Sequence, residues 1–208
     1  MVKVGINGFG RIGRLILRAI LENYKNKIQV VAINDLGSIE TNAHLIKYDS
    51  THGIINEDIQ TSKDGFKIGN QEIKVFAEKD PANIPWGKVG ADVVLECTGI
   101  FLDKSSAEKH IQGGAKKVII SAPGKEVDFT IVQGVNSKEL KKEHNIISNG
   151  SCTTNCLAPV AMVLEKTFGI SYGYMTTIHS YTGDQKLLDT LHTDLRRARS
   201  TEGAMIPP

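Results

Sequence analysis

Residues 151–156 read SCTTNC and combine a cysteine with hydroxyl groups where an expected strand gives way to an expected helix. Ser151 is a favourable helix N-cap residue, so Cys152 would lie in the first helical turn. The helix field favours the thiolate there, and the thiolate is the nucleophilic form of cysteine. The hydroxyl groups of Ser151 and Thr153 can donate hydrogen bonds to a phosphate. This pattern predicts nucleophilic catalysis at Cys152.

A nucleophilic cysteine usually requires a neighbouring base, and His179 is the best candidate. It stands near the end of residues 172–180 (YGYMTTIHS), whose aromatic and β-branched side chains predict a strand. The other histidines fall in expected helices or loops, where we expect them to be solvated or structural. They are His44, His52, His110, His144 and His192.

The chain has three cysteines, Cys97, Cys152 and Cys156. An odd number without a secretory signal argues against a disulfide framework. Two thiols and a histidine also suggest zinc, but the Cys152–Cys156 spacing does not match the common structural sites, and no fourth ligand is evident. We therefore expect no metal site, and we expect Cys97 and Cys156 to be buried and structural.

Near the N-terminus, the sequence GFGRIG follows an expected strand and opens an expected helix, which is the context that a dinucleotide-binding fingerprint requires. Gly8 would permit the tight turn, Gly10 the approach of a pyrophosphate, and Gly13 the close packing of helix on strand. Backbone N–H groups of Arg11 and Ile12 would face the anion at the helix N-terminus. The pattern predicts a dinucleotide site.

An acidic residue, Asp35, ends the second expected strand about twenty residues after the last glycine of the fingerprint. A carboxylate at this place hydrogen-bonds an adenosine ribose and repels a 2′-phosphate, so it favours NAD over NADP. The alternative is that the glycines only make a turn and that Asp35 only caps a loop. The strand, glycines, helix, second strand and acid stand in register, and this favours the NAD site.

The elements that would position these residues alternate between apolar strands and amphipathic helices, which predicts an α/β fold with a doubly wound parallel sheet. We expect a nucleotide-binding domain over residues 1–150 and a second domain over residues 151–208. Expected strands cover residues 2–7, 28–34, 91–96, 117–121, 129–132, 146–148 and 172–180, with a hairpin over 66–76. Expected helices cover residues 11–23, 41–48, 106–113 and 151–168.

The composition narrows the possible partners and location. The 208 residues include 25 Lys and Arg against 23 Asp and Glu, a formal net charge of +2. This balance indicates no nucleic-acid or membrane-surface partner. The sequence shows neither a signal peptide nor an apolar run long enough to span a membrane, so we expect a cytoplasmic protein.

Together these motifs resemble the glyceraldehyde-3-phosphate dehydrogenase family. The likeness runs through essentially the whole chain, and SCTTNCLAP with HSYTGDQ is highly specific to this family and its near relatives. Other matching stretches are INGFGRIGR, NDL, HLIKYDSTHG, ECTG, KKVIISAP and DLRRAR. The resemblance implies an NAD-dependent phosphorylating aldehyde dehydrogenase with a Rossmann-type domain, followed by an α+β catalytic domain of which the chain holds only the first part.

The resemblance also implies roles for individual residues. Cys152 would be the nucleophile and His179 the residue that activates it. Arg197 matches an anion contact, with Arg196 and Arg199 as rivals. The other implied contacts are with phosphate, through Ser151, Thr153 and Thr182, and with NAD, through Arg11, Ile12, Asp35, Lys79 and Ser121.

The implied reaction oxidises glyceraldehyde 3-phosphate, with inorganic phosphate, to 1,3-bisphosphoglycerate through a thiohemiacetal and a thioester. It belongs to glycolysis or gluconeogenesis, and the family implies a homotetramer. Two alternatives remain open. An erythrose-4-phosphate dehydrogenase would share the fold and the Cys–His pair, and a truncated NAD-binding fragment would bind the dinucleotide without catalysis.

The sequence departs from the family pattern at a few places. Gly150 stands where alanine is frequent, and Cys97 stands where serine or alanine is commoner. Thr190 and Leu191 differ from the LDLPH segment of NAD-specific members, which leaves use of both NAD and NADP open. The chain stops before the expected STGAA segment, so a phosphate-binding threonine and arginine and the closing helix of the cofactor domain are expected outside it.

Overall fold

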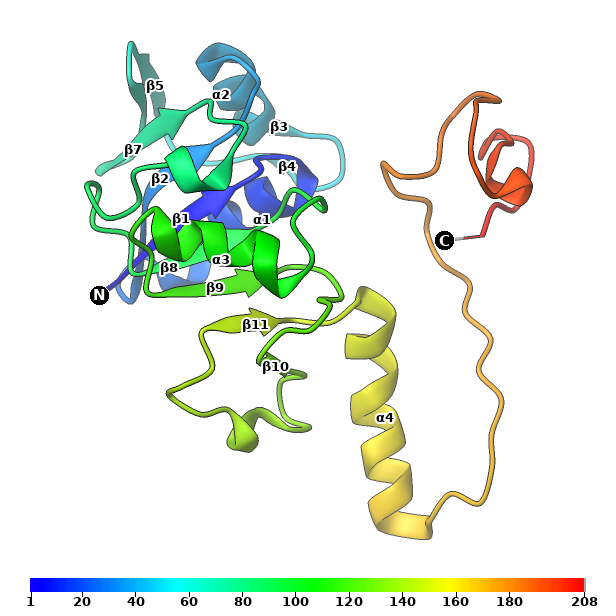
Figure 1. Ribbon diagram of the computed structural model, residues 1–208. Coiled ribbons are helices and arrows are strands. Elements are labelled where there is room, and N and C mark those ends of the chain that lie inside the picture. Colours follow the sequence, from blue (N-terminus) through cyan, green and yellow to red (C-terminus); the bar gives the residue numbers. More distant parts are fainter. Residues whose placement is uncertain (208) are drawn as a thin grey trace. The chain divides into compact units, whose positions relative to one another are not determined.

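A nine-stranded sheet with strand order β10-β11-β9-β8-β1-β2-β7-β6-β5 forms the framework of the first part of the chain (Figure 1). The computed structural model describes residues 1–207, which divide into two units, Met1–Thr167 and the residues from Phe168 onward. The sheet lies in the first unit. Its strands are β1 (Val2–Asn7), β2 (Ile28–Asn34), β5 (Ile59–Ser62), β6 (Gly65–Ile68), β7 (Gln71–Phe76), β8 (Val93–Glu96), β9 (Lys117–Ile120), β10 (Phe129–Thr130) and β11 (Ile146–Ser148).

The remaining elements within residues 1–207 are four α-helices, four short helical turns and two short strands. A two-stranded sheet pairs β3 (Tyr48–Asp49) with β4 (Gly53–Ile54). The α-helices are α1 (Arg11–Ala19), α2 (Ile39–Lys47), α3 (Lys104–Gln112) and α4 (Cys152–Phe168). A π-helical turn, η1 (Ile20–Tyr24), prolongs α1, and the 3-10 turns are η2 (Pro81–Asn83), η3 (Ser137–Glu139) and η4 (Leu195–Arg197).

The predicted doubly wound fold is confirmed by the pairing of the strands and by their two buried faces. β1 pairs in parallel with β2 on one side and with β8 on the other, so the strand order reverses at β1. Val4 and Ile6 of β1 pack with Leu17 of α1 on one face. On the other face, Val118 of β9 packs with Ala107 of α3. Helices therefore pack on both faces of the sheet, as in parallel sheets generally.

The predicted hairpin is present as β6 and β7, joined at Gly69 and Asn70. β5 extends this edge by a further antiparallel strand that the sequence did not predict. Its residues Ile59–Ser62 are short and mostly polar, so they lack the apolar run that identifies a buried strand. The predicted helix over residues 11–23 is also present, although its last part, from Ile20 onward, is the π-helical turn η1.

The helix predicted over residues 151–168 is confirmed as α4, but its apolar face is exposed. No residue of α4 is buried against the rest of the first unit. Val160 and Leu164 are more than two-fifths exposed. Cys156 is exposed for the same reason, so the prediction that it is buried was wrong. Helical periodicity identifies an apolar face but does not specify which segment packs against it.

The strand predicted over residues 172–180 does not form. This segment lies in the second unit, and none of the described residues pairs with it as a strand. Tyr174 and Ile178 are almost fully exposed. The prediction was wrong because aromatic and β-branched residues favour a strand only where a partner strand and a packing surface exist.

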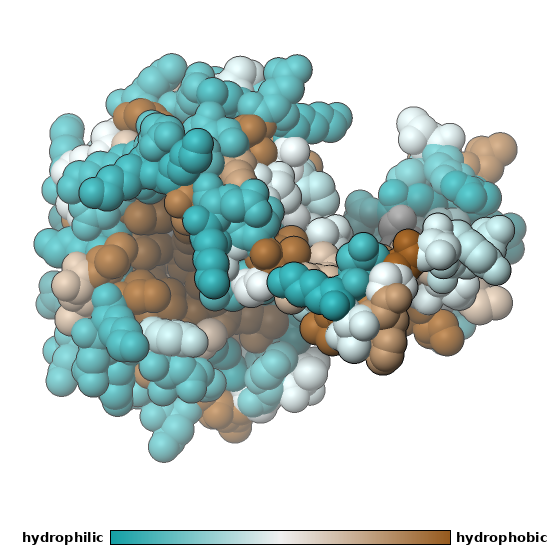
Figure 2. Space-filling model, turned by 90° about the horizontal axis from the view of Figure 1, so that it is seen from below, coloured by the Kyte–Doolittle hydropathy of each residue, from teal (hydrophilic) through white to brown (hydrophobic). Residues whose placement is uncertain are grey.

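One face of the sheet is less completely covered around β8 and β9. Val94 and Val118 face α3 and are fully buried, whereas Val93, Leu95 and Ile119 alternate with them and are half-buried. Figure 2 shows apolar side chains gathered in a hollow of the larger unit when it is seen from below. None of the helices within residues 1–207 has both the length and the apolar character needed to cross a bilayer.

Candidate functional site

The turn between β1 and α1 has little room for side chains at two of its three glycines. Gly8 has a φ of +87°, and a Cβ there would lie 2.7 Å from the backbone nitrogen of Thr98. A Cβ on Gly13 would lie 2.3 Å from the carbonyl oxygen of Gly8. At Gly10, by contrast, no described atom lies within 4 Å of an added Cβ. The backbone at Gly10 is therefore accessible to a ligand, while Gly8 and Gly13 hold the turn in place.

The N-terminus of α1 offers donors to an anion. No side chain in the described part of the chain caps it at Gly10. The backbone N–H groups of its first turn are therefore available to a phosphate group. The guanidinium of Arg11 is turned to Asp49, with 2.8 Å between Nη1 and Oδ2. This contact and the backbone N–H of His52 hold the pKa of the Asp49 carboxyl well below its usual range.

Asp35 is held beside the glycine-rich turn by two backbone donors. Its Oδ2 accepts a hydrogen bond from the N–H of Phe9 at 2.8 Å, and its Oδ1 accepts one from the N–H of Gly37, also at 2.8 Å. Asp35 follows β2 and is only half-buried. A carboxylate held in this way keeps further lone pairs for a ligand hydroxyl.

Four of the predicted dinucleotide-site residues line one cavity of about 560 Å³, which we call the dinucleotide cavity, whereas Arg11, Ile12, Gly13 and Ser121 do not line it. Gly8, Gly10, Asp35 and Lys79 line it, although they lie far apart in the sequence. The cavity opens beside the carboxyl ends of β1 and β8, where the strand order reverses, and this is the usual ligand position in open α/β sheets. Sequence reasoning missed several other lining residues, which lie at the ends of predicted strands or within a few residues after them. These are Asn7, Asn34, Glu78, Cys97, Thr98, Ile100 and Phe101.

Ser121 follows β9, one strand further along the sheet. It does not line this cavity but hydrogen-bonds a residue that does. Its hydroxyl hydrogen-bonds Cys97, which lines the cavity. Burial raises the pKa of the Cys97 thiol to about 12, so this cysteine is protonated at neutral pH. Cys97 is therefore a packing residue and a poor nucleophile.

The predicted start of α4 is confirmed by its capping contacts. Ser151 Oγ accepts a hydrogen bond from the N–H of Thr154 at 3.0 Å, which makes Ser151 the N-cap and Cys152 the first helical residue. Gly150 has a φ of +68°, a conformation that glycine adopts far more readily than alanine. Asn155 Nδ2 donates to the carbonyl oxygen of Asn149 at 2.6 Å and further secures the turn. Cys152 is exposed at the helix N-terminus.

His179, Thr182 and Arg197 lie in the second unit. His179 Nδ1 contacts the carbonyl oxygen of Ser180. The N–H of Thr182 donates to Gln185 Oε1 at 2.7 Å. Because Cys152 lies in the first unit and His179 in the second, their pairing stays a prediction.

Among the three arginines of the LRRAR segment, Arg197 is the most enclosed. Its side chain is 20% exposed, against 74% for Arg196 and 67% for Arg199. Arg197 forms an ion pair with Asp184, and its buried Nε has no hydrogen-bond partner among residues 1–207. A buried donor without a partner is uncommon, and it suits an anion contact better than the exposed guanidinium of either rival.

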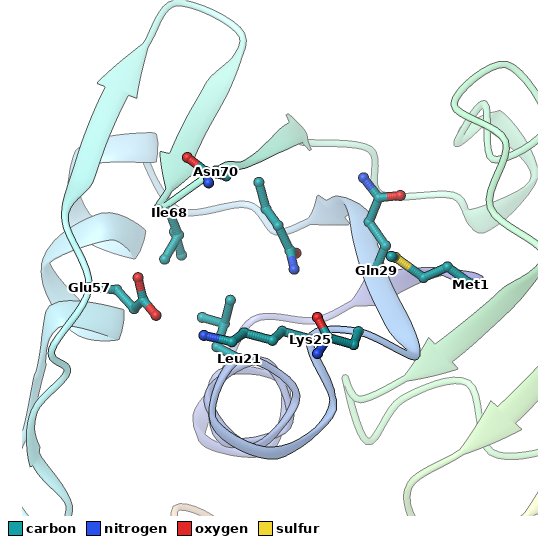
Figure 3. A pocket seen from close by; sticks show the side chains of 10 residues that line it. Met1, Leu21, Lys25, Gln29, Glu57, Ile68 and Asn70 are labelled. Atoms are coloured by element: carbon teal, nitrogen blue, oxygen red, sulfur yellow. The ribbon is translucent and has the colours of Figure 1, made fainter.

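A second cavity, of about 450 Å³, lies between η1 and the β6–β7 hairpin (Figure 3). Its lining mixes apolar and charged side chains, among them Leu21, Lys25, Glu57 and Ile68. None of the predicted site residues, all of which the structure describes, lines this cavity. It is therefore separate from the dinucleotide cavity.

Two family models match the chain. Residues 2–104 match "Glyceraldehyde 3-phosphate dehydrogenase, NAD binding domain", and residues 151–208 match "Glyceraldehyde 3-phosphate dehydrogenase, C-terminal domain". The chain belongs to the glyceraldehyde-3-phosphate dehydrogenase family. The boundary predicted at residues 150 and 151 remains a proposal, which the start of the second match supports.

Curated relatives with the family name match almost the whole length of this chain. The glyceraldehyde-3-phosphate dehydrogenase of Xanthobacter flavus is 54% identical over 206 residues, covering 99% of this chain and 62% of the relative. Glyceraldehyde-3-phosphate dehydrogenase 1 of Bacillus cereus is 54% identical over 208 residues, covering 100% of this chain and 62% of the relative. The chromosomal enzyme of Cupriavidus necator is 55% identical over 208 residues, again covering 62% of its length. The chain thus spans about three-fifths of the length of these relatives.

Within this family assignment, the cavity suits an NAD molecule. The open backbone at Gly10 and the uncapped start of α1 fit a pyrophosphate, and the anchored carboxylate of Asp35 fits a ribose diol. Lys79 lines the same cavity and would add a positive charge near a bound dinucleotide. The binding roles of all these residues, and of Arg11, Ile12, Gly13 and Ser121, remain predictions.

Proposed function

We propose that the chain carries the NAD-binding region and the nucleophile of a phosphorylating glyceraldehyde-3-phosphate dehydrogenase. The reaction would convert glyceraldehyde 3-phosphate, inorganic phosphate and NAD into 1,3-bisphosphoglycerate and NADH. The observation that supports this most strongly is the cavity in which Gly8, Gly10 and Asp35 meet at the strand-order reversal. The exposed Cys152 at the start of α4 supplies the second requirement, a nucleophile in the first turn of a helix.

Cys152 would begin the reaction. Its thiol proton passes to His179, the thiolate attacks the aldehyde carbon, and the carbonyl oxygen takes that proton from His179 to give a thiohemiacetal. The positive end of α4 stabilises the thiolate before attack, and the backbone N–H of Cys152 can stabilise the oxyanion.

His179 would accept the proton of the thiohemiacetal hydroxyl as a general base. NAD, when bound, supplies the hydride acceptor. Loss of the proton to His179 and of the hydride leaves a thioester on Cys152. Inorganic phosphate then attacks the thioester carbon, the C–S bond breaks, and the thiolate of Cys152 is regenerated with release of the acyl phosphate.

Two phosphate groups must be held, one on the substrate and one that attacks. We assign Ser151, Thr153, Thr182 and Arg197 to these contacts. The buried Nε of Arg197 supports this assignment because an arriving anion would satisfy it. The ion pair of Arg197 with Asp184 would rearrange or be shared when phosphate binds.

We further propose a cytoplasmic homotetramer that acts in glycolysis or gluconeogenesis. The near-neutral charge and the family assignment support this. Thr190 and Leu191 leave room for use of NADP, while Asp35 favours NAD. Native mass spectrometry tests the tetramer, and a monomeric mass at assay concentrations would contradict it.

The function is tested by calorimetric NAD titration together with an NADH-absorbance assay. We expect NAD binding and phosphate-dependent turnover of glyceraldehyde 3-phosphate, which the Cys152→Ser variant should lose. Faster turnover of erythrose 4-phosphate would reassign the substrate. NAD binding without turnover of either aldehyde would identify a binding module, and failure to bind NAD would refute the proposed site.

A further inference from the structure

Glu96, at the carboxyl end of β8, is a buried acid surrounded by hydrogen-bond donors. Only 1% of it is exposed. Its Oε2 accepts from Asn7 Nδ2 at 2.6 Å and contacts His110 Nε2 at 2.9 Å. Its Oε1 accepts from the N–H of Thr98 at 2.7 Å and from the Thr98 hydroxyl. Four donors on one side chain suit a group that only accepts, which is the carboxylate form.

His110 of α3 is oriented by the only tryptophan of the chain, Trp86. The indole Nε1–H donates to His110 Nδ1 at 3.0 Å. Because an indole nitrogen cannot accept, Nδ1 must be the acceptor, and the ring proton resides on Nε2. The Nε2–H therefore donates to Glu96. Both rings are fully buried, so this arrangement excludes water.

The network continues from Glu96 along the strand ends. Asn7, Asn34 and Glu96 are in-register neighbours on β1, β2 and β8, so their side chains lie on one face of the sheet. Asn34 Nδ2 donates to Asn7 Oδ1 at 2.8 Å. Asn34 also binds both backbone groups of Glu78, at 2.9 Å and 2.8 Å. One buried hydrogen-bond network thus connects α3 with the ends of β8, β1 and β2 and with the segment after β7.

The members of this network also form the wall of the dinucleotide cavity. Asn7, Asn34, Glu78 and Thr98 all line it. Thr98 lies against Gly8, at the approach distance that leaves no space for a Cβ on that glycine. Glu96 therefore holds both sides of this close contact, Asn7 before the glycine turn and Thr98 after β8.

We propose that Glu96 is a positioning residue for dinucleotide binding. Its carboxylate, oriented through His110, keeps the Gly8 turn against Thr98 and so sets the shape of the cavity. This inference rests on the proposed NAD site, and it adds a role for a side chain that does not itself line the cavity.

The first test is the Glu96→Gln variant, which preserves size but places an NH₂ group against one of the donors. We expect the Kd for NAD, measured by calorimetry, to rise about tenfold or more, as loss of one hydrogen bond to a buried charge implies. Val118→Ala is the matched control. Val118 is fully buried on the same sheet face, packs with Ala107 and has no place in the network. We expect it to lower the Tm and to leave the Kd unchanged.

The second readout does not require NAD. In Glu96→Gln, we expect hydrogen exchange to accelerate at the amides of Gly8 and Thr98, while amides of β9 keep their protection. If Glu96→Gln does not fold, His110→Gln is the substitute variant. It should show the same pattern of amide hydrogen exchange with a smaller rise in the Kd for NAD. The emission of Trp86 reports whether the indole environment has changed.

The outcomes separate this inference from the proposed function. Wild-type protein that does not bind NAD would refute the proposed site, and faster exchange at Gly8 and Thr98 would still support the positioning role of Glu96. The Glu96→Gln variant could instead keep the wild-type Kd for NAD and the wild-type amide hydrogen exchange while its Tm falls as in Val118→Ala. That result would show that Glu96 only stabilises the fold.

Discussion

The carboxylate of Asp35 accepts a hydrogen bond from the backbone N–H of Phe9, with 2.8 Å between Oδ2 and N. This contact joins the acid at the end of β2 to the glycine-rich turn after β1. One hydrogen bond therefore connects the proposed ribose contact with the turn that would contact the pyrophosphate. A change at Asp35 should affect both the choice between NAD and NADP and the order of the turn.

Replacing Asp35 tests the choice of dinucleotide. In Asp35→Gly, we expect the Kd for NAD to rise about tenfold and NADP to bind relatively better, because the charge that repels a 2′-phosphate is gone. Asp35→Asn retains an oxygen that can accept from Phe9, so it separates charge from anchoring. Calorimetric Kd values for both dinucleotides give the ratio, and an unchanged ratio would remove Asp35 from the ribose contact.

Alanine at Gly13 should lower stability, whereas alanine at Gly10 should weaken NAD binding. In Gly13→Ala, the new methyl group meets the Gly8 carbonyl oxygen, so we expect unfolding free energy to fall by about 1–3 kcal/mol. In Gly10→Ala, the methyl group meets no described atom, so stability should stay within about 0.5 kcal/mol while the Kd for NAD rises. Urea denaturation and calorimetry measure the two quantities. Equal stability losses would contradict the steric assignment.

The three cysteines should differ in reactivity toward iodoacetamide at neutral pH. We expect Cys152 to react first, Cys156 second and Cys97 last, as measured by mass spectrometry of peptides over time. The helix start favours the Cys152 thiolate, whereas burial raises the pKa of the Cys97 thiol to about 12. Cys156 is exposed but lies one turn further from the helix end. Equal rates at Cys152 and Cys156 would argue against activation at the helix start.

The proposed nucleophile has a kinetic test of its own. Cys152→Ser should reduce kcat about a thousandfold or more, because a serine hydroxyl is not ionised at neutral pH. Cys156→Ser, one turn further along α4, is the matched control and should keep its turnover. A Cys152→Ser variant that keeps half of its turnover would place the nucleophile elsewhere.

Acid should weaken the strand ends around Asp128. The backbone N–H of Ile146 and the Lys104 ammonium lower the pKa of this carboxyl to about 2. Its contribution is therefore complete above the ordinary aspartate pKa of about 3.9 and is lost as pH falls toward 2. We expect Asp128→Asn to cost about 1 kcal/mol at pH 7 and nearly nothing at pH 2, in urea denaturation. A pH-independent difference would contradict this assignment.

Helices and strands whose ends carry local sequence signals could be predicted from the sequence. The predicted and observed bounds agree for β1 and β2, because a mostly apolar run and a following glycine or acid delimit each strand. The start of α4 was equally predictable, because Ser151 supplies an N-cap that acts within one turn. Such signals depend on neighbours along the chain.

Predictions failed where the outcome depends on contacts with distant segments. Residues 172–180 have strand-forming side chains but no partner strand within residues 1–207. Cys156 lies on an apolar helix face that nothing in the first unit covers. In both cases the residue types indicate what would be buried, and only the packing partner decides whether burial occurs.

The groups that can do chemistry were identifiable from the amino-acid sequence, namely a cysteine at a helix start, a glycine-rich turn and an acid after the second strand. These features act over a few residues, so spacing along the chain is sufficient to find them. The buried network in which Glu96 joins Asn7, 89 residues away, and His110 is visible only in the folded chain. Parallel strand register brings such residues together, and register between strands far apart in the chain is set by packing of the whole sheet.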